Sequence, residues 1–236
     1  MEILYEDKYL IAVNKKPGWV VQGSRKEQDS LLVQVKSFLK ERDKKEGNVF
    51  LAVLHRLDKP VSGVLVFAKR SKTAAKFFKL MQDQRVIKIY LAKVEGEFKE
   101  EEDLWEDYIF VKSNLKPALT LFKLLKSNVK ESLLLLSPLT GRKHQLRIAL
   151  AKRGYPIIGD TFYGSKQKVL EGKAVLLHAL YLSFSHPHTS ELLEIWAPIP
   201  NYFQLKALDK WTILEFLNKI KKEKEKQKYV SGQNLD

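Results

Sequence analysis

The stretch that sets the expected fold is His55-Arg56-Leu57-Asp58-Lys59-Pro60-Val61-Ser62-Gly63, which leads into an apolar run over residues 63–68. The run is continuously apolar, which is typical of a strand buried on both faces. The preceding residues are polar and include a proline, so they predict a loop that carries polar side chains to the start of that strand. From the residues alone, an Asp before Lys-Pro is more often a turn former than a catalytic group.

Apolar periodicity predicts strands and helices on both sides of this loop. Apolar residues recur at helical spacing over 71–81 and alternate over 87–92, which places Lys88 and Tyr90 on the face opposite the isoleucines. The other expected elements are strands at 9–13, 119–125, 132–136, 175–184 and 193–196, and helices at 30–39, 140–154 and 203–217. We expect the acidic residues 100–107 to form an exposed excursion. The mixture predicts an α+β fold with a central mixed, mostly antiparallel sheet flanked by helices.

Charge and composition limit the function classes. Lys and Arg number 42 against 28 Asp and Glu, a net charge of +14, which favours a polyanionic partner such as nucleic acid. Solubility is the alternative explanation of this charge. The chain has no cysteine, which excludes disulfides, thiolate metal sites and cysteine nucleophiles. No signal peptide and no membrane-spanning apolar run are recognisable, so we expect a cytoplasmic protein with no membrane partner.

Two further segments could carry chemistry. Residues 140–147 concentrate basic groups, and on a helix Lys143 and Arg147 would share a face with His144 beside them. The alternative is a solvated helix face. His186 and His188 would point to opposite sides of an extended chain, so we expect no metal site there.

Several ordered motifs resemble the RluA family of pseudouridine synthases. The loop around Asp58 resembles the family signature, and residues 88–96 resemble its tyrosine motif. Residues 141–147 and 154–160 resemble its third motif, and residues 177–187 resemble its closing strand. The match covers about residues 1–200 and lacks the accessory N-terminal RNA-binding module of many relatives. On this basis we divide the chain into a catalytic domain, 1–218, and a lysine-rich tail, 219–236, which either contacts RNA or only aids solubility.

The resemblance implies a pseudouridine synthase fold with a basic active-site cleft. It also implies isomerisation of uridine to pseudouridine in structured RNA, without cofactor or metal. Asp58 matches the catalytic carboxylate, acting as nucleophile or base. Arg147 matches the arginine that pairs with it and keeps it ionised. Tyr90 matches the tyrosine that stacks on the flipped base.

The resemblance also suggests residues that bind the RNA. Arg56 matches the residue that fills the space vacated by the flipped base, and Leu177 matches a position lining the pocket. We expect Arg142, Lys143 and His144 to bind backbone phosphates of the RNA. We also include His55 among the RNA-binding residues. Three positions depart from the usual family residues. The family usually has Thr where this chain has Val61 and Lys143, and often has His where this chain has Ala149.

The sequence leaves substrate and activity open at several points. Transfer RNA is slightly favoured over ribosomal RNA, because residues 57–60 resemble a Leu-Asp-Arg-Pro variant of the transfer RNA subfamily. The alternative is an inactive RNA-binding or ribosome-assembly factor with the same fold. An enzyme acting on small phosphorylated substrates lacks a recognisable phosphate loop. The compact length favours a monomer.

Overall fold

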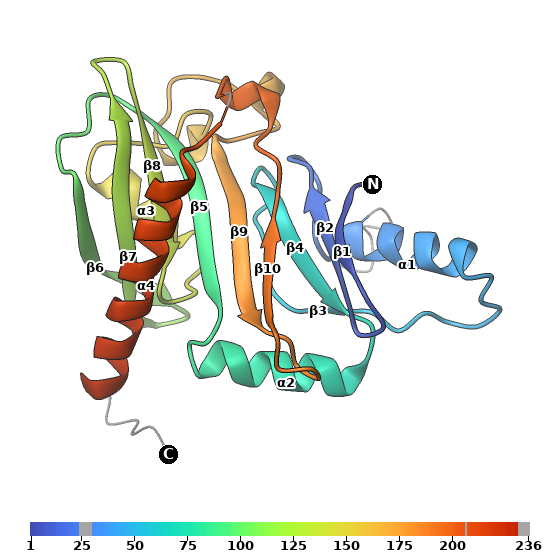
Figure 1. Ribbon diagram of the computed structural model, residues 1–236. Coiled ribbons are helices and arrows are strands. Elements are labelled where there is room, and N and C mark those ends of the chain that lie inside the picture. Colours follow the sequence, from blue (N-terminus) through green and yellow to red (C-terminus); the bar gives the residue numbers. More distant parts are fainter. Residues whose placement is uncertain (24–29, 206, 231–236) are drawn as a thin grey trace.

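The computed structural model describes residues 1–23, 30–205 and 207–230. One ten-stranded sheet runs in the order β1-β2-β4-β9-β5-β8-β7-β6, with β3 paired to β4 and β10 to β9 (Figure 1). The strands are β1 (Ile3–Glu6), β2 (Leu10–Lys15), β3 (Ala52–Val53), β4 (Ser62–Ala68), β5 (Ile87–Glu95), β6 (Glu102–Val111), β7 (Asn114–Ser127), β8 (Glu131–Pro138), β9 (Leu177–Ser185) and β10 (Leu192–Trp196). The α-helices are α1 (Leu31–Arg42), α2 (Ser71–Gln82), α3 (Gln145–Lys152) and α4 (Lys210–Val230). Three short 3-10 helices are η1 (Thr161–Tyr163), η2 (Leu170–Gly172) and η3 (Asn201–Phe203).

The sheet confirms the expected α+β class. Only the β4–β9 pair is parallel among the pairings of the named strands, and all others are antiparallel. Every residue of β4 is buried, as the continuous apolar run predicted. No helix in the described ranges is long and apolar enough to cross a membrane.

The strands β4 and β9 approach closely at Gly63. A Cβ atom built on Gly63 would lie 2.2 Å from the carbonyl oxygen of Ala179, and the φ of Gly63 is +116°. Only glycine tolerates both the positive φ and this contact. The approach brings the loop before β4 beside Leu177, the first residue of β9.

Helices α3 and α4 cover opposite faces of the β6–β7 end of the sheet (Figure 1). On one face, Arg153, the residue after α3, pairs with Asp107 and lies over the ring of Trp105. On the other face, Lys219 of α4 pairs with Glu102 at 2.8 Å. Residues 102 and 107 differ by an odd number, so their side chains leave the strand on opposite faces.

Three expectations about elements were wrong. The acidic residues between 100 and 107 are mostly exposed, as expected, but they do not form an excursion, because most of them belong to β6, where Asp107 is buried beside Arg153. Helix α3 begins at Gln145 rather than near Thr140. The closing helix begins at Lys210 rather than near Phe203, which instead belongs to η3.

The expected boundary between domain and tail falls inside α4. This helix continues through residue 219, and Ile220 is fully buried in the core. The Lys224 ammonium, 8% exposed, donates to the carbonyl oxygens of Gln84 and Val86. Ile220 and Lys224 of the expected tail therefore pack against the body, whereas residues 231–236 lie outside the described residues.

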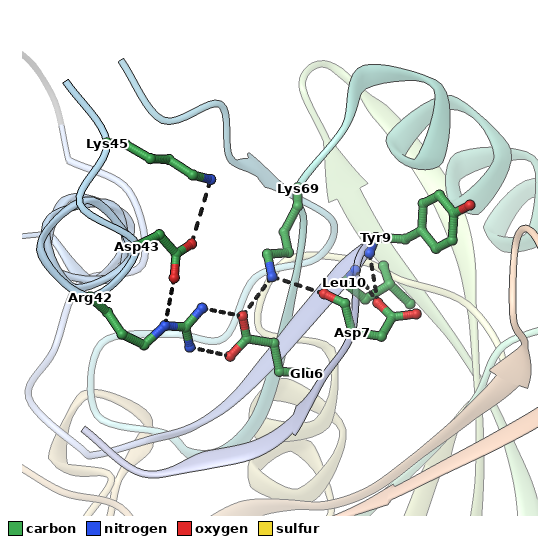
Figure 2. Close-up of polar contacts among 8 residues, drawn as sticks. All are labelled: Glu6, Asp7, Tyr9, Leu10, Arg42, Asp43, Lys45 and Lys69. Atoms are coloured by element: carbon green, nitrogen blue, oxygen red, sulfur yellow. Dashed lines mark hydrogen bonds and ion pairs between the residues drawn. The ribbon is translucent and has the colours of Figure 1, made fainter. Parts of the chain in front are cut away.

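A polar cluster ties the first strand to α1 and to the end of β4 (Figure 2). The Arg42 guanidinium donates to both carboxylate oxygens of Glu6, at 2.6 and 2.7 Å, and Lys69 pairs with the same carboxylate. The hydrogen bonds from Arg42 lower the pKa of Glu6 to about 2. Asp7 accepts the backbone N–H groups of Tyr9 and Leu10, which fixes the turn into β2.

Candidate active site

A cleft of about 450 Å³ lies at the ends of β4, β5 and β9 and before α3. All nine side chains that the sequence selected as site residues line it: His55, Arg56, Asp58, Tyr90, Arg142, Lys143, His144, Arg147 and Leu177. They come from four segments that are far apart in the chain, so the fold brings them together. Lys59 and Lys88 also line the cleft. Among the described residues that line it, Asp58 is the one acidic residue, so the cleft is strongly basic.

A buried lysine donates hydrogen bonds to the backbone of the turn that contains Asp58. The Lys15 ammonium, fully buried at the end of β2, donates to the carbonyl oxygens of Asp58 at 3.2 Å, Lys59 at 3.0 Å and Val61 at 2.6 Å. The N–H of Val61 donates to the Asp58 carbonyl at 3.0 Å, which closes the turn. Burial lowers the pKa of Lys15 to about 7, although the nearby Asp58 raises it.

Sequence reasoning missed Lys15, although a signal was present. Ile11, Val13 and Lys15 alternate along β2, and the first two belong to the core. The period of two places Lys15 on the same buried face. A buried lysine needs hydrogen-bond acceptors, so this position indicates a structural role for its ammonium.

The Asp58 carboxylate pairs with Arg147, as the resemblance implied. Arg147 Nη1 lies 3.2 Å from Asp58 Oδ2. The other side of the guanidinium makes two bonds to Asp160, Nε to Oδ2 at 2.7 Å and Nη2 to Oδ1 at 2.8 Å. Arg147 is 6% exposed and Asp160 1%, so Asp160 fixes the guanidinium in a buried, bidentate geometry. Asp160 belongs to the motif at 154–160, but the sequence does not predict its contact with Arg147.

His144 lies against the second oxygen of Asp58. Its Nε2 is 3.6 Å from Asp58 Oδ1, and its Nδ1 is 2.9 Å from the hydroxyl of Tyr163. His144 has a left-handed backbone, φ 55° and ψ 21°, and precedes the first helical residue of α3. The expectation that Lys143 and Arg147 share a helix face was therefore wrong, because Lys143 lies before the helix begins.

Tyr90 and Lys88 project into the cleft from one face of β5, as the alternation predicted. Burial and the nearby Asp58 raise the pKa of Tyr90, so its phenol remains protonated at neutral pH. Burial lowers the pKa of Lys88 to about 8. His55 is held by the fold, because its Nε2 accepts the Val66 N–H at 3.2 Å; burial and Lys88 lower its pKa to about 3.

The remaining predicted residues lie around the same cleft. Arg56 and Lys143 are exposed, whereas Leu177 is 3% exposed at the start of β9. Arg142 donates from Nε to the carbonyl oxygen of Pro117 at 3.0 Å, which links the cleft to β7. Within the described ranges, no three His, Asp or Glu residues are grouped so that they could hold a metal ion.

Comparisons with known proteins identify the family of the chain. A family model described as RNA pseudouridylate synthase matches residues 9–152. The tRNA pseudouridine synthase C of Vibrio vulnificus is 34% identical over 232 residues, covering 86% of this chain and 93% of that protein. The ribosomal large subunit pseudouridine synthase C of Buchnera aphidicola is 33% identical over 220 residues, covering 86% and 68% respectively.

A third relative and a solved structure extend the agreement. The dual-specificity RNA pseudouridine synthase of Vibrio parahaemolyticus is 32% identical over 219 residues, covering 85% of this chain and 84% of that protein. The structure of human RNA Pseudouridylate Synthase Domain Containing 1 superposes with a TM-score of 0.70 at 26% identity, covering 92% of this chain and 94% of that one. The chain therefore belongs to the RluA family of RNA pseudouridine synthases and is an isomerase that makes pseudouridine in RNA.

Proposed function

We propose that this isomerase acts through Asp58 on a uridine flipped out of a structured RNA into the cleft, and that transfer RNA is its preferred substrate. The observation that carries the proposal is the setting of Asp58. Arg147 contacts one carboxylate oxygen at 3.2 Å, and Tyr90 lines the same cleft. The Arg147 guanidinium is a fixed positive charge beside this side chain, and a carboxylate can act as nucleophile or base.

The reaction breaks the bond between uracil N1 and the sugar C1′ and forms a bond between C5 and C1′. The proton on C5 is lost and N1 gains one, so the product is an isomer and no electrons enter or leave. Asp58 starts cleavage either by attacking C1′ or by removing a proton from the sugar. Tyr90 packs its ring on the detached base, and its protonated phenol can relay a proton.

The cleft also contains the groups that a flipped base requires. Extrusion of a base leaves a gap in the stack, and Arg56 is an exposed guanidinium that can fill it by stacking and hydrogen bonding. Arg142 and Lys143 provide positive charge for phosphates at the mouth of the cleft. His55 and Leu177 form part of its wall.

One observation supports transfer RNA over ribosomal RNA. Residues 57–60, Leu-Asp-Lys-Pro, resemble the Leu-Asp-Arg-Pro variant of the transfer RNA subfamily. The similar relatives do not favour either RNA, because one is named for tRNA, one for the large ribosomal subunit, and one for dual specificity. We also propose a cytoplasmic protein and, from its compact length, a monomer. Light scattering of the purified protein tests the monomer.

Tritium release from RNA labelled at C5 of uracil tests the proposal. Bulk transfer RNA and bulk ribosomal RNA are offered separately to the wild type, to Asp58→Ala, and to Asp103→Ala, which changes an exposed aspartate outside the cleft. We expect release from transfer RNA by the wild type and by Asp103→Ala, and none by Asp58→Ala. Release from ribosomal RNA only would reassign the substrate. RNA binding without release from either pool would support an inactive binding factor instead.

A further inference from the structure

We infer that Tyr163 is a positioning residue for Asp58, because it fixes both side chains that approach the two carboxylate oxygens. The ring of Tyr163 holds Arg147, and its hydroxyl holds His144. The inference rests on the proposed role of Asp58 in catalysis.

The contact with Arg147 is made by the face of the aromatic ring. The guanidinium carbon of Arg147 lies 4.9 Å from the centre of the Tyr163 ring, within the range of a cation–π contact. Asp160 binds the edge of the same guanidinium through two hydrogen bonds. Asp160 and Tyr163 are three residues apart at η1. One short segment therefore contacts the edge of the Arg147 guanidinium through Asp160 and its face through Tyr163. This leaves Nη1 free to contact Asp58.

The contact with His144 determines which ring nitrogen carries the proton. Burial lowers the pKa of His144, so at neutral pH the ring is neutral and has one N–H. Burial raises the pKa of Tyr163, so its hydroxyl keeps its proton and can donate to Nδ1. The single proton of His144 then lies on Nε2, 3.6 Å from Oδ1 of Asp58. The opposite tautomer would direct a lone pair at the carboxylate, which is repulsive.

The backbone of His144 indicates that its position is enforced. A left-handed conformation is unfavourable at a non-glycine residue, so surrounding contacts must maintain it. The hydroxyl of Tyr163 is one such contact, and the edge of Phe162 lies against the same imidazole at 6.4 Å between ring centres. Residues of η1 therefore hold His144 in an unfavourable conformation that faces Asp58.

Two substitutions separate the functions of ring and hydroxyl. Tyr163→Phe keeps the ring over Arg147 and removes only the hydroxyl, whereas Tyr163→Leu removes both. Tyr108→Phe is the matched control, because Tyr108 is 61% exposed on β6 and does not line the cleft. One neutral hydrogen bond is worth about 0.5–1.5 kcal/mol, so we expect Tyr163→Phe to slow single-turnover tritium release about 2- to 12-fold. Tyr163→Leu should slow it further, and Tyr108→Phe should leave it unchanged.

Nitrogen-15 NMR of the histidine rings provides the readout that a merely structural role would not change. The spectrum of His144→Gln assigns the His144 resonances. We expect the Nε2–H tautomer in the wild type and in Tyr108→Phe, and a mixture of tautomers in Tyr163→Phe. An unchanged tautomer with an unchanged rate in Tyr163→Phe would overturn the inference. A lower melting temperature of Tyr163→Phe, with the His144 tautomer and the pH dependence of the rate both unchanged, would also overturn the inference.

The same experiment keeps the inference separate from the proposed function. If Asp58→Ala retains tritium release, the proposed function of Asp58 fails, whatever the tautomer of His144. If Asp58→Ala is inactive but Tyr163→Phe behaves as the wild type in rate and spectrum, the positioning role of Tyr163 is refuted and the catalytic role of Asp58 is supported.

Discussion

Arg147 joins two carboxylates of different exposure, Asp58 in the cleft and Asp160 behind it. Nη1 lies 3.2 Å from Asp58, whereas Nε and Nη2 lie 2.7 and 2.8 Å from Asp160. The Asp160 side chain is 1% exposed and that of Asp58 is 29% exposed. The buried pair therefore anchors the guanidinium, and the more accessible carboxylate remains available to substrate.

Asp160→Asn tests this anchor. The substitution removes the charge from the bidentate pair and leaves Nε and Nη2 of a buried guanidinium with one neutral amide oxygen, so we expect a loss of about 2–4 kcal/mol in the free energy of unfolding. Urea denaturation measures that loss, and tritium release should slow as well because Arg147 no longer holds Asp58. Asp103→Asn, at an exposed aspartate, is the control. Wild-type stability and rate in Asp160→Asn would contradict the anchoring role.

Lys15→Met tests the support beneath Asp58. The substitution keeps much of the side-chain volume but leaves buried carbonyl oxygens of the Asp58 turn without their donor, so we expect a loss of about 2–4 kcal/mol in unfolding free energy. The rate per folded molecule should also fall, because the turn is no longer fixed. Lys16→Met changes the exposed neighbour and should do neither. A stable, fully active Lys15→Met protein would rule out the support.

Lys143→Ala tests phosphate binding at the cleft mouth. An exposed lysine that contacts a phosphate contributes about one unit to the salt dependence of RNA binding. We expect the slope of log affinity against log salt to become shallower by about that amount for every RNA. Arg142→Ala should act in the same direction. Lys72→Ala, exposed on α2 outside the cleft, should keep the wild-type slope. A loss confined to one RNA, at unchanged slope, would exclude a phosphate role.

Glu6→Gln tests the ion pairs drawn in Figure 2 through their pH dependence. The pKa of Glu6 is lowered from 4.5 to about 2 in the folded state, chiefly by hydrogen bonds from Arg42. A lowered carboxyl pKa stabilises the fold above pH 4.5, and this stabilisation is lost as the pH falls toward 2. Because Arg42 is partly exposed, we expect Glu6→Gln to cost about 1 kcal/mol at pH 7.

Urea denaturation at pH 7, 5 and 3 measures this effect. The stability difference between the wild type and Glu6→Gln should shrink as the pH decreases. Glu225→Gln, an exposed glutamate on α4, should show no such trend. A difference that stays constant from pH 7 to pH 3 would show that the carboxylate charge of Glu6 does not stabilise the fold.

Local periodicity predicted the elements in which the pattern of apolar residues within one segment determines which side chains are buried. The continuous apolar run gave β4, helical spacing gave α2, and alternation gave β5 with Tyr90 facing the cleft. The ordered motifs selected nine residues that share one cleft. The predictions of β4, α2 and β5 succeeded because each depends on side chains close together in the sequence, whereas the cleft residues were found through the family resemblance.

The errors arose where distant segments decide the structure. Acidic residues 102 and 107 lie in a strand because Lys219 and Arg153, far along the chain, neutralise them. Helix α3 starts late because His144 adopts a left-handed turn that Tyr163 helps to hold. Lys15 was overlooked because three of its acceptors, the carbonyl oxygens of the Asp58 turn, are more than forty residues away.

Single-turnover tritium release by Asp58→Asn tests the central claim most directly. The substitution preserves the shape of the side chain and removes only the charge that Arg147 faces. With RNA binding measured in parallel, we predict that Asp58→Asn binds the substrate RNA as the wild type does and releases no tritium. Asp103→Asn should release it at the wild-type rate. Release by Asp58→Asn at a rate near that of the wild type would contradict the assignment of Asp58 as the carboxylate that starts the reaction.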